Sequence, residues 1–184
     1  MSDLYVGQHE IITTSSETLT AVILELKGKE VLAQELGTRR EDILKSLLKK
    51  FEHLHVKKTW GETSLFFNPE EKSPNGSYFL TLKESDGEND KASELDRKSI
   101  FRISFGISRT TYENLFGPTP PRPAKGGVVQ TGHDFRQTNH LMPHPIYAWM
   151  NWVQILNPSA NTWMSIQDLI EESYQLSKNR FEKR

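Results

Sequence analysis

The chain has 184 residues, of which 35% are apolar and 26% charged, enough for one globular domain of ordinary size around a single core. Its 23 basic and 24 acidic residues give a net charge of −1, which provides no general attraction to nucleic-acid phosphates or anionic lipid. The lack of cysteine excludes disulfides, thiolate metal sites and thiol nucleophiles. No apolar run is long enough for a membrane span and the first residues lack a signal-peptide pattern, so we expect a cytoplasmic protein.

Residues 1–38 have the least regular pattern of the chain. Thr18–Leu26 is rich enough in β-branched residues for a strand. Thr14 with Glu17 also forms the capping box of a helix that would run to Leu36. Both interpretations stay open, and a strand followed by a short helix is the one we favour.

A helix is predicted over Arg40–Leu54, because apolar residues recur there at steps of three and four and form one stripe. Three short β-rich runs follow it, at Val56–Trp60, Ser64–Phe67 and Ser77–Lys83. Residues 84–98 mix acids and bases with Gly, Asn and Ser and supply no core stripe. We therefore expect a solvated loop there.

The second half of the chain begins with a strand over Ser99–Ile107, whose alternation places Ile100, Arg102, Ser104 and Gly106 on one face. Ser108 is the expected N-cap of a short helix that ends at Phe116. A proline-rich segment and Gly126-Gly127 then predict a long connecting loop.

The last elements are a strand over Trp152–Leu156 and a helix over Ser165–Arg180. Runs of strands with helices grouped around them are typical of the α+β class. We therefore expect a two-layer antiparallel sheet with helices packed on one side.

Residues Ala33–Lys49 have the spacing of a helix-turn-helix, with a small residue, a glycine four positions on and an isoleucine six further. Such a unit would make the protein a DNA-binding regulator. However, the second helix would carry Glu41 and Asp42 toward the DNA, and its apolar stripe already serves the larger domain. A plain pair of helices is the favoured interpretation, and nucleic acid is a disfavoured partner.

Three of the six histidines fall within twelve residues, as His133, His140 and His144, with Asp134 beside the first. Imidazole and carboxylate groups can hold a divalent metal such as Zn²⁺ without cysteine. Two prolines flank His144 and prevent an uninterrupted helix, so the required geometry does not follow from the spacing. The alternative is that these histidines hydrogen-bond loop carbonyls and brace an irregular segment.

Residues 99–164 hold nine of the eighteen aromatic Phe, Tyr and Trp residues and only seven charged ones. Such a cluster is either ordinary core or the lining of an apolar pocket on which a few polar groups converge. The candidate ligand-binding residues are Arg102, His133, Asp134, His144, Tyr147 and Trp152. No nucleophile elbow and no phosphate-binding glycine loop occurs in the sequence.

Four unusual blocks occur in order along the chain: Trp60-Gly61-Glu62-Thr63, Leu95-Asp96-Arg97, Gly132-His133-Asp134-Phe135 and Met142-Pro143-His144-Pro145. In these blocks the chain resembles an uncharacterised family of small, mainly bacterial proteins, over about residues 40–181. It is also distantly similar to MmcQ/YjbR-like α+β domains. The resemblance implies an N-terminal extension over residues 1–39 and a single α+β domain over residues 40–184.

The resemblance names no reaction, although the MmcQ/YjbR-like similarity implies binding of DNA or a small molecule. We expect a module that binds a small molecule or a protein, with its site formed by the long loop after Gly117 and the segment Met142–Trp152. An alternative is a metal-dependent hydrolytic enzyme in which His133, Asp134, His140 and His144 hold a divalent metal. A DNA-binding regulator is the second alternative.

Overall fold

The computed structural model describes residues 3–5, 11–13, 39–59 and 61–183, and the chain divides into two units, Met1–Leu36 and Gly37–Arg184. In the first unit, strand β1 (Asp3–Tyr5) pairs antiparallel with β2 (Ile11–Thr13). The capping box and the strand expected at Thr18–Leu26 lie outside the described residues, as does the first helix of the expected helix-turn-helix.

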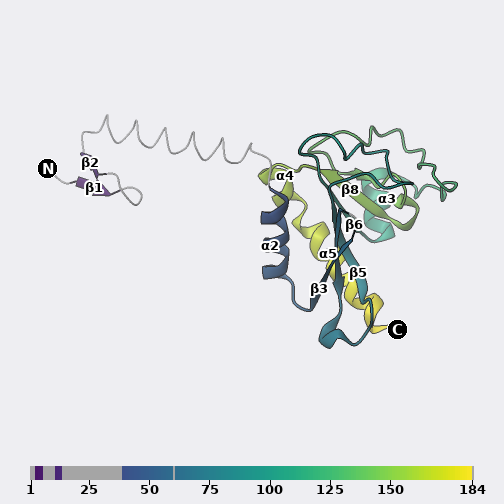
Figure 1. Ribbon diagram of the computed structural model, residues 1–184, viewed down its shortest axis with the longest axis horizontal. Coiled ribbons are helices and arrows are strands. Elements are labelled where there is room, and N and C mark those ends of the chain that lie inside the picture. Colours follow the sequence, from purple (N-terminus) through teal and green to yellow (C-terminus); the bar gives the residue numbers. More distant parts are fainter. Residues whose placement is uncertain (1–2, 6–10, 14–38, 60, 184) are drawn as a thin grey trace. The chain divides into compact units, whose positions relative to one another are not determined.

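The second unit contains a six-stranded antiparallel sheet in the order β3-β4-β5-β6-β8-β7 (Figure 1). Its strands are β3 (Leu54–Thr59), β4 (Glu62–Phe67), β5 (Ser77–Lys83), β6 (Arg102–Gly106), β7 (Met142–Pro143) and β8 (Trp152–Leu156). The sheet and its helices confirm the α+β class. Five of the six strands overlap runs that the sequence predicts, and β7 is the one it does not.

The helices of this unit are α2 (Arg40–Lys50), α3 (Arg109–Phe116), α4 (Ala160–Ser165) and α5 (Gln167–Glu182), with short 3-10 turns η1 (Pro69–Glu71) and η2 (Ala148–Met150). The predicted cap of α3 is confirmed, because the Ser108 hydroxyl accepts a hydrogen bond from the Thr111 N–H at 3.1 Å. Helix α2 ends four residues earlier than predicted, because the chain turns extended at Phe51 and enters β3 at Leu54.

One face of the sheet forms the apolar core. Helix α5 packs against β4, β5 and β6, and α2 adds Ile43, Leu47 and Phe51 to the same core. The ring of Phe51, the residue that caps the C-terminus of α2, lies 5.1 Å from the Phe79 ring and 4.6 Å from the Tyr174 ring of α5. These contacts join α2, β5 and α5 in the same core. The strand residues on this face are Leu65, Leu80, Leu82, Ile103, Phe105, Val153 and Ile155.

The opposite face of the sheet is polar. Directly paired residues of antiparallel strands share a face, and the register pairs Glu62 with Lys83 and Lys83 with Arg102. The next row of the same face holds Ser64, Thr81, Ser104 and Gln154. Lys83 is only 9% exposed and Arg102 only 2% exposed, so the loops that cover this face bury its charges.

The loop over residues 84–98 is one of these covers, which corrects the expectation that it is fully solvated. It contains no helix or strand, as expected. However, Ser93 and Leu95 are buried, and Asp90 bonds to the polar face of the sheet. The Asp86 carboxylate fixes the loop by accepting the backbone N–H of Leu95 at 2.8 Å.

Candidate functional site

A cavity of about 680 Å³ opens over the polar face of the sheet, a size typical of small-molecule sites. Its floor comes from β4, β5 and β6, and its walls come from the loop over residues 84–98, the proline-rich loop and the segment around η2. The residues that line it are Glu62, Tyr78, Thr81, Lys83, Asn89, Asp90, Arg102, residues 122–127, His144, Ile146, Tyr147, Trp149, Met150 and Trp152.

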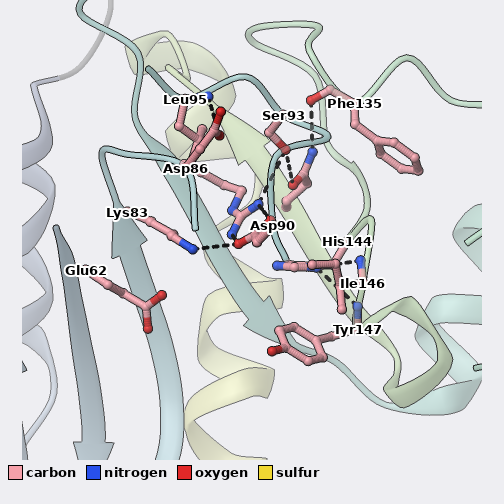
Figure 2. Close-up of polar contacts among 12 residues, drawn as sticks. Glu62, Lys83, Asp86, Asp90, Ser93, Leu95, Phe135, His144, Ile146 and Tyr147 are labelled. Carbon is pink, nitrogen blue, oxygen red and sulfur yellow. Dashed lines mark hydrogen bonds and ion pairs between the residues drawn. The ribbon is translucent and has the colours of Figure 1, made fainter. Parts of the chain in front are cut away.

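Three charged side chains form a buried cluster at the floor. The Asp90 carboxylate accepts two hydrogen bonds from the Arg102 guanidinium, one of them 2.9 Å long, and one from the Lys83 ammonium at 2.7 Å (Figure 2). Burial by itself raises the pKa of Asp90, but the bonds and charges of Arg102 and Lys83 outweigh it and hold that pKa well below its usual range. Asp90 is therefore ionised, and the cluster carries one net positive charge.

The backbone places the members of this cluster with little freedom. Lys83 ends β5 and Arg102 begins β6, and the register sets them directly opposite each other. Asp90 belongs to a tight turn in which Gly87 and Asp90 exchange two backbone hydrogen bonds of 3.1 Å. A Cβ atom on Gly87 would lie 3.1 Å from the Lys83 Nζ, so a glycine there lets the ammonium reach the carboxylate.

A second set of polar contacts supports Arg102 from behind. Its Nη1 donates to the Ser93 hydroxyl at 3.4 Å, and that hydroxyl donates to the Gln154 side chain at 3.0 Å. Gln154 in turn donates to the carbonyl of Phe135 at 3.2 Å. The Arg102 Nε–H is buried and has no hydrogen-bond partner among the described residues.

His144 is 2% exposed and forms part of the cavity wall. Its Nδ1 accepts two backbone hydrogen bonds, from Ile146 at 3.1 Å and from Tyr147 at 3.2 Å. A nitrogen that accepts carries no proton, so the ring proton of the neutral imidazole lies on Nε2. Figure 2 shows this second nitrogen on the side of the ring that faces Asp90.

Burial, together with the positive charge of Arg102 and Lys83, lowers the pKa of His144 well below its usual value, and the nearby Asp90 offsets only part of this effect. The imidazole is therefore neutral at physiological pH. It presents one N–H donor, and the prolines on both sides of it restrict the backbone that holds the ring.

Aromatic rings form the rest of the wall. The Trp152 ring lies 6.2 Å from the Tyr78 ring and 6.4 Å from the Tyr147 ring, and the Arg122 guanidinium lies 4.9 Å from the Trp149 ring. A Cβ atom on Gly106 would come within 3.1 Å of the Trp152 indole nitrogen. The glycine on β6 therefore allows the indole to lie close against the sheet.

The structure places four of the six candidate ligand-binding residues on this cavity, namely Arg102, His144, Tyr147 and Trp152. It places His133 and Asp134 elsewhere. The His133 Nδ1 lies 3.0 Å from the Thr131 hydroxyl. The exposed carboxylate of Asp134 pairs with Arg136 at 2.9 Å, and this hydrogen-bonded pairing lowers the pKa of Asp134.

The four candidate metal ligands do not come together. Within residues 39–59 and 61–183, no group of three His, Asp or Glu side chains could hold a metal ion, and this range includes all four candidates. His140 is exposed, Asp134 bonds Arg136, and His144 uses Nδ1 to accept backbone N–H groups. Their closeness in sequence therefore does not produce a cluster in space.

Sequence reasoning missed most of the charged floor. The sequence pattern predicts only a strand at Lys83, and it places Asp90 in a loop that looks solvated. The alternation in Ser99–Ile107 did place Arg102 and Ser104 on one face, and their burial identifies that face as unusual. The same alternation in Ser77–Lys83 would have paired Lys83 with Arg102 if the strand register had been known.

The two arginines at the start of the second helix of the expected helix-turn-helix are paired within the domain, whereas Lys45 and Lys49 on the same helix are exposed. In α2, the Arg40 side chain is 14% exposed, bonds the Thr63 hydroxyl and lies 3.4 Å from the Glu84 carboxylate. Arg39, which precedes the helix, pairs with Asp42 at 2.8 Å. Both arginines are therefore already bonded within the domain.

These features define an α+β domain with a charged, aromatic-walled cavity on the polar face of its sheet. The chain matches the family DUF6194, described as a family of unknown function, over residues 38–184, and it belongs to that family. No curated protein and no solved structure matches the chain. The similarity to MmcQ/YjbR-like domains and the two-layer packing stay predictions. Within the described part of the chain, no helix combines the length and apolar character needed to cross a membrane.

Proposed function

We propose that this domain is a binding module for a small organic molecule, which it takes up in the cavity over the polar face of the sheet. The observation that carries the proposal is a cavity of about 680 Å³ that has buried charges at its floor and aromatic rings in its wall. Binding sites for small molecules typically combine an apolar lining with a few placed polar groups.

The depth of the polar groups favours a small molecule over a protein partner. Arg102 and His144 are each only 2% exposed, so a flat protein surface would not reach them. A small molecule that enters the cavity can contact the floor and the rings of Tyr147 and Trp152 together. The metal-dependent hydrolase lacks comparable support, because its four expected ligands are not clustered.

The proposal is tested by a thermal-shift screen of the full-length protein against a library of small metabolites of all charge types. A ligand that binds only the folded state stabilises it by mass action and so raises the midpoint of thermal unfolding. At a ligand concentration of a hundred times Kd, the added stability is about 2.7 kcal/mol. We expect at least one chemical class to raise the midpoint. A screen in which no compound does so would contradict the proposal.

Two matched variants show whether the hits occupy the cavity. Tyr147 is 46% exposed and lines the cavity, whereas Leu115 is 49% exposed on α3 and does not. Tyr147→Ala should weaken each hit about fivefold, since an aromatic contact contributes about 1 kcal/mol. Leu115→Ala should leave the affinities unchanged. Hits that are indifferent to Tyr147→Ala bind elsewhere and count against the proposal.

A further inference from the structure

We infer that the ligand of this cavity is an organic anion, whose anionic group accepts hydrogen bonds from the Lys83 ammonium and the His144 Nε2–H while its planar body lies against Tyr147 and Trp152. This inference deepens the proposed function and rests on it. It assigns a ligand charge and names the two groups that recognise it.

The first argument is the charge of the floor. Lys83, Arg102 and Asp90 have side chains that are 11%, 3% and 14% exposed, and their formal charges sum to one positive charge. In the described part of the chain, Asp90 is the only carboxylate within ion-pair distance of either cation. A charge removed from water without a partner is unfavourable. An anion in the cavity would supply that partner.

The second argument is the excess of donors. Both oxygens of Asp90 accept bonds from Arg102, and one of them also accepts from Lys83. The Lys83 ammonium has three N–H groups and uses one of them on Asp90. The His144 Nε2–H has no protein acceptor among the described residues. The floor can therefore donate more hydrogen bonds than it can accept, and carboxylate oxygens match that need.

The third argument is the formal charge of the whole cavity lining. The Glu62 carboxylate lines the same cavity beside Lys83 and accepts a hydrogen bond from the Ser64 hydroxyl at 2.9 Å. Four basic residues, Lys83, Arg102, Arg122 and Lys125, line the cavity against two acidic ones, Glu62 and Asp90, so the lining has an excess of two formal positive charges. The lining is thus suited to an anion, and the aromatic wall is suited to an apolar planar body.

Three probes of the same size and shape test the inference on the wild-type full-length protein: benzoate, benzamide and benzamidine. Their charges are negative, neutral and positive. Titrations are followed by NMR with ¹⁵N-labelled histidine, in which the His144 Nε2–H reports contact at the floor. We expect benzoate to bind about tenfold or more tightly than benzamide, with benzamidine the weakest, and benzoate to shift the His144 signal most.

Variants identify the groups responsible. Lys83→Met keeps the length of the side chain and removes the charge, so the preference for benzoate over benzamide should fall close to one. Lys98→Met is the matched control, since Lys98 is exposed and does not line the cavity. His144→Asn retains an acceptor near the position of Nδ1 and removes the Nε2–H donor, and it should weaken benzoate several-fold.

The outcomes separate the inference from the proposed function. Equal binding of benzoate and benzamide, or tighter binding of benzamidine, overturns the inference and leaves small-molecule binding intact. If none of the three probes binds at millimolar concentration, the inference is overturned, and a negative metabolite screen then overturns the proposed function as well. The comparison of probes uses only the wild-type protein, so it stands even if Lys83→Met does not fold.

Discussion

At the scale of single residues, Asp90 links the stability of the domain to the charge of its cavity. Its carboxylate bonds Arg102 and Lys83 in a place with little access to water. Removing one member of a buried ion cluster costs more than the cluster itself contributes, because it leaves a charge without a partner. A change that neutralises Asp90 should therefore destabilise the folded domain but strengthen the attraction of the cavity for an anion.

We therefore predict that Asp90→Asn lowers the free energy of unfolding by about 3–5 kcal/mol and at the same time tightens benzoate binding. The floor then holds two positive charges in place of one. Urea denaturation measures the first effect and titration the second. Asp134→Asn is the control, since its pair with Arg136 is exposed to solvent, and it should leave stability almost unchanged. Unchanged stability of Asp90→Asn would contradict the buried cluster.

His144 should make the stability of the domain depend on pH. The unfolded chain protonates a histidine near its usual pKa of about 6.5, whereas the folded domain holds the pKa of His144 well below that value. Protons then bind the unfolded state first, so stability is full above about pH 6.5 and falls as the pH drops below it, by up to about 1.4 kcal/mol per pH unit.

Free energies of unfolding between about pH 7 and pH 5 check this prediction. His144→Asn should lower the slope of the free energy of unfolding against pH by the contribution of one titrating group. His140→Asn, a change at an exposed histidine, should retain the slope of the wild type. A slope that is the same in both variants would show that His144 is not held neutral by the fold.

The residues of the site differ in how far sequence could predict them. Arg102, His144, Tyr147 and Trp152 lie in a segment rich in aromatic residues and poor in charge, so each stood out as a candidate. Asp90 did not, because it lies among acids and bases that look like a solvated surface. Its role depends on the fold of a turn around Gly87, and no periodic pattern encodes such a turn.

At the scale of elements, α3 depends on its cap. The Ser108 hydroxyl accepts a hydrogen bond from the Thr111 N–H. Because the helix has only eight residues, each hydrogen bond at its ends is a large fraction of all the hydrogen bonds that stabilise it. We predict that Ser108→Ala lowers the free energy of unfolding by about 1 kcal/mol. Denaturant unfolding checks this value.

Thr110→Ala is the control for that prediction. It lies in the first turn of the same helix, is exposed and forms no part of the cap. It should leave stability almost unchanged, since alanine is a better helix former than threonine. If both changes cost the same, the contribution comes from general helix propensity, and the cap has no special role.

Local patterns predicted the long elements well and the short ones poorly. The apolar stripe of α2 and the alternation of β6 depend on residues within each element, so the sequence contains the whole signal. Strand β7 has two residues and exists only because β8 pairs with it. The helix predicted over Ser165–Arg180 corresponds to α5, whereas the short helix α4 before it is not predicted. Ile166 separates the two helices because it leaves helical geometry, with φ of −98° and ψ of 7°.

At the scale of the whole molecule, the division into two units predicts the effect of a truncation. The core residues of the sheet, α2 and α5 all belong to residues 37–184. We therefore expect the chain without residues 1–36 to remain soluble and to unfold in one cooperative transition. Circular dichroism during thermal unfolding measures this. Loss of cooperativity would mean that the first unit supplies part of the core.

The cavity could not be predicted from sequence because three distant segments form it. Its floor requires the register that sets Lys83 against Arg102, and its wall requires the chain around residues 144–152 to fold back over the same face. Neither the strand register nor this long-range contact is encoded in a local pattern of the sequence. The α+β class is different, since the order of the elements suggests it before any pairing is known.

The order of strands also affects how the domain behaves when crowded. Exposed outer strands invite pairing with other chains and lead to aggregation. One outer strand of the six-stranded sheet, β3, carries Lys57 and the exposed Lys58, and the other, β7, is only two residues long and contains Pro143, which has no N–H to donate. Charge on one side and a short, proline-containing strand on the other both discourage the addition of a further strand, which favours a domain that stays dispersed at high concentration.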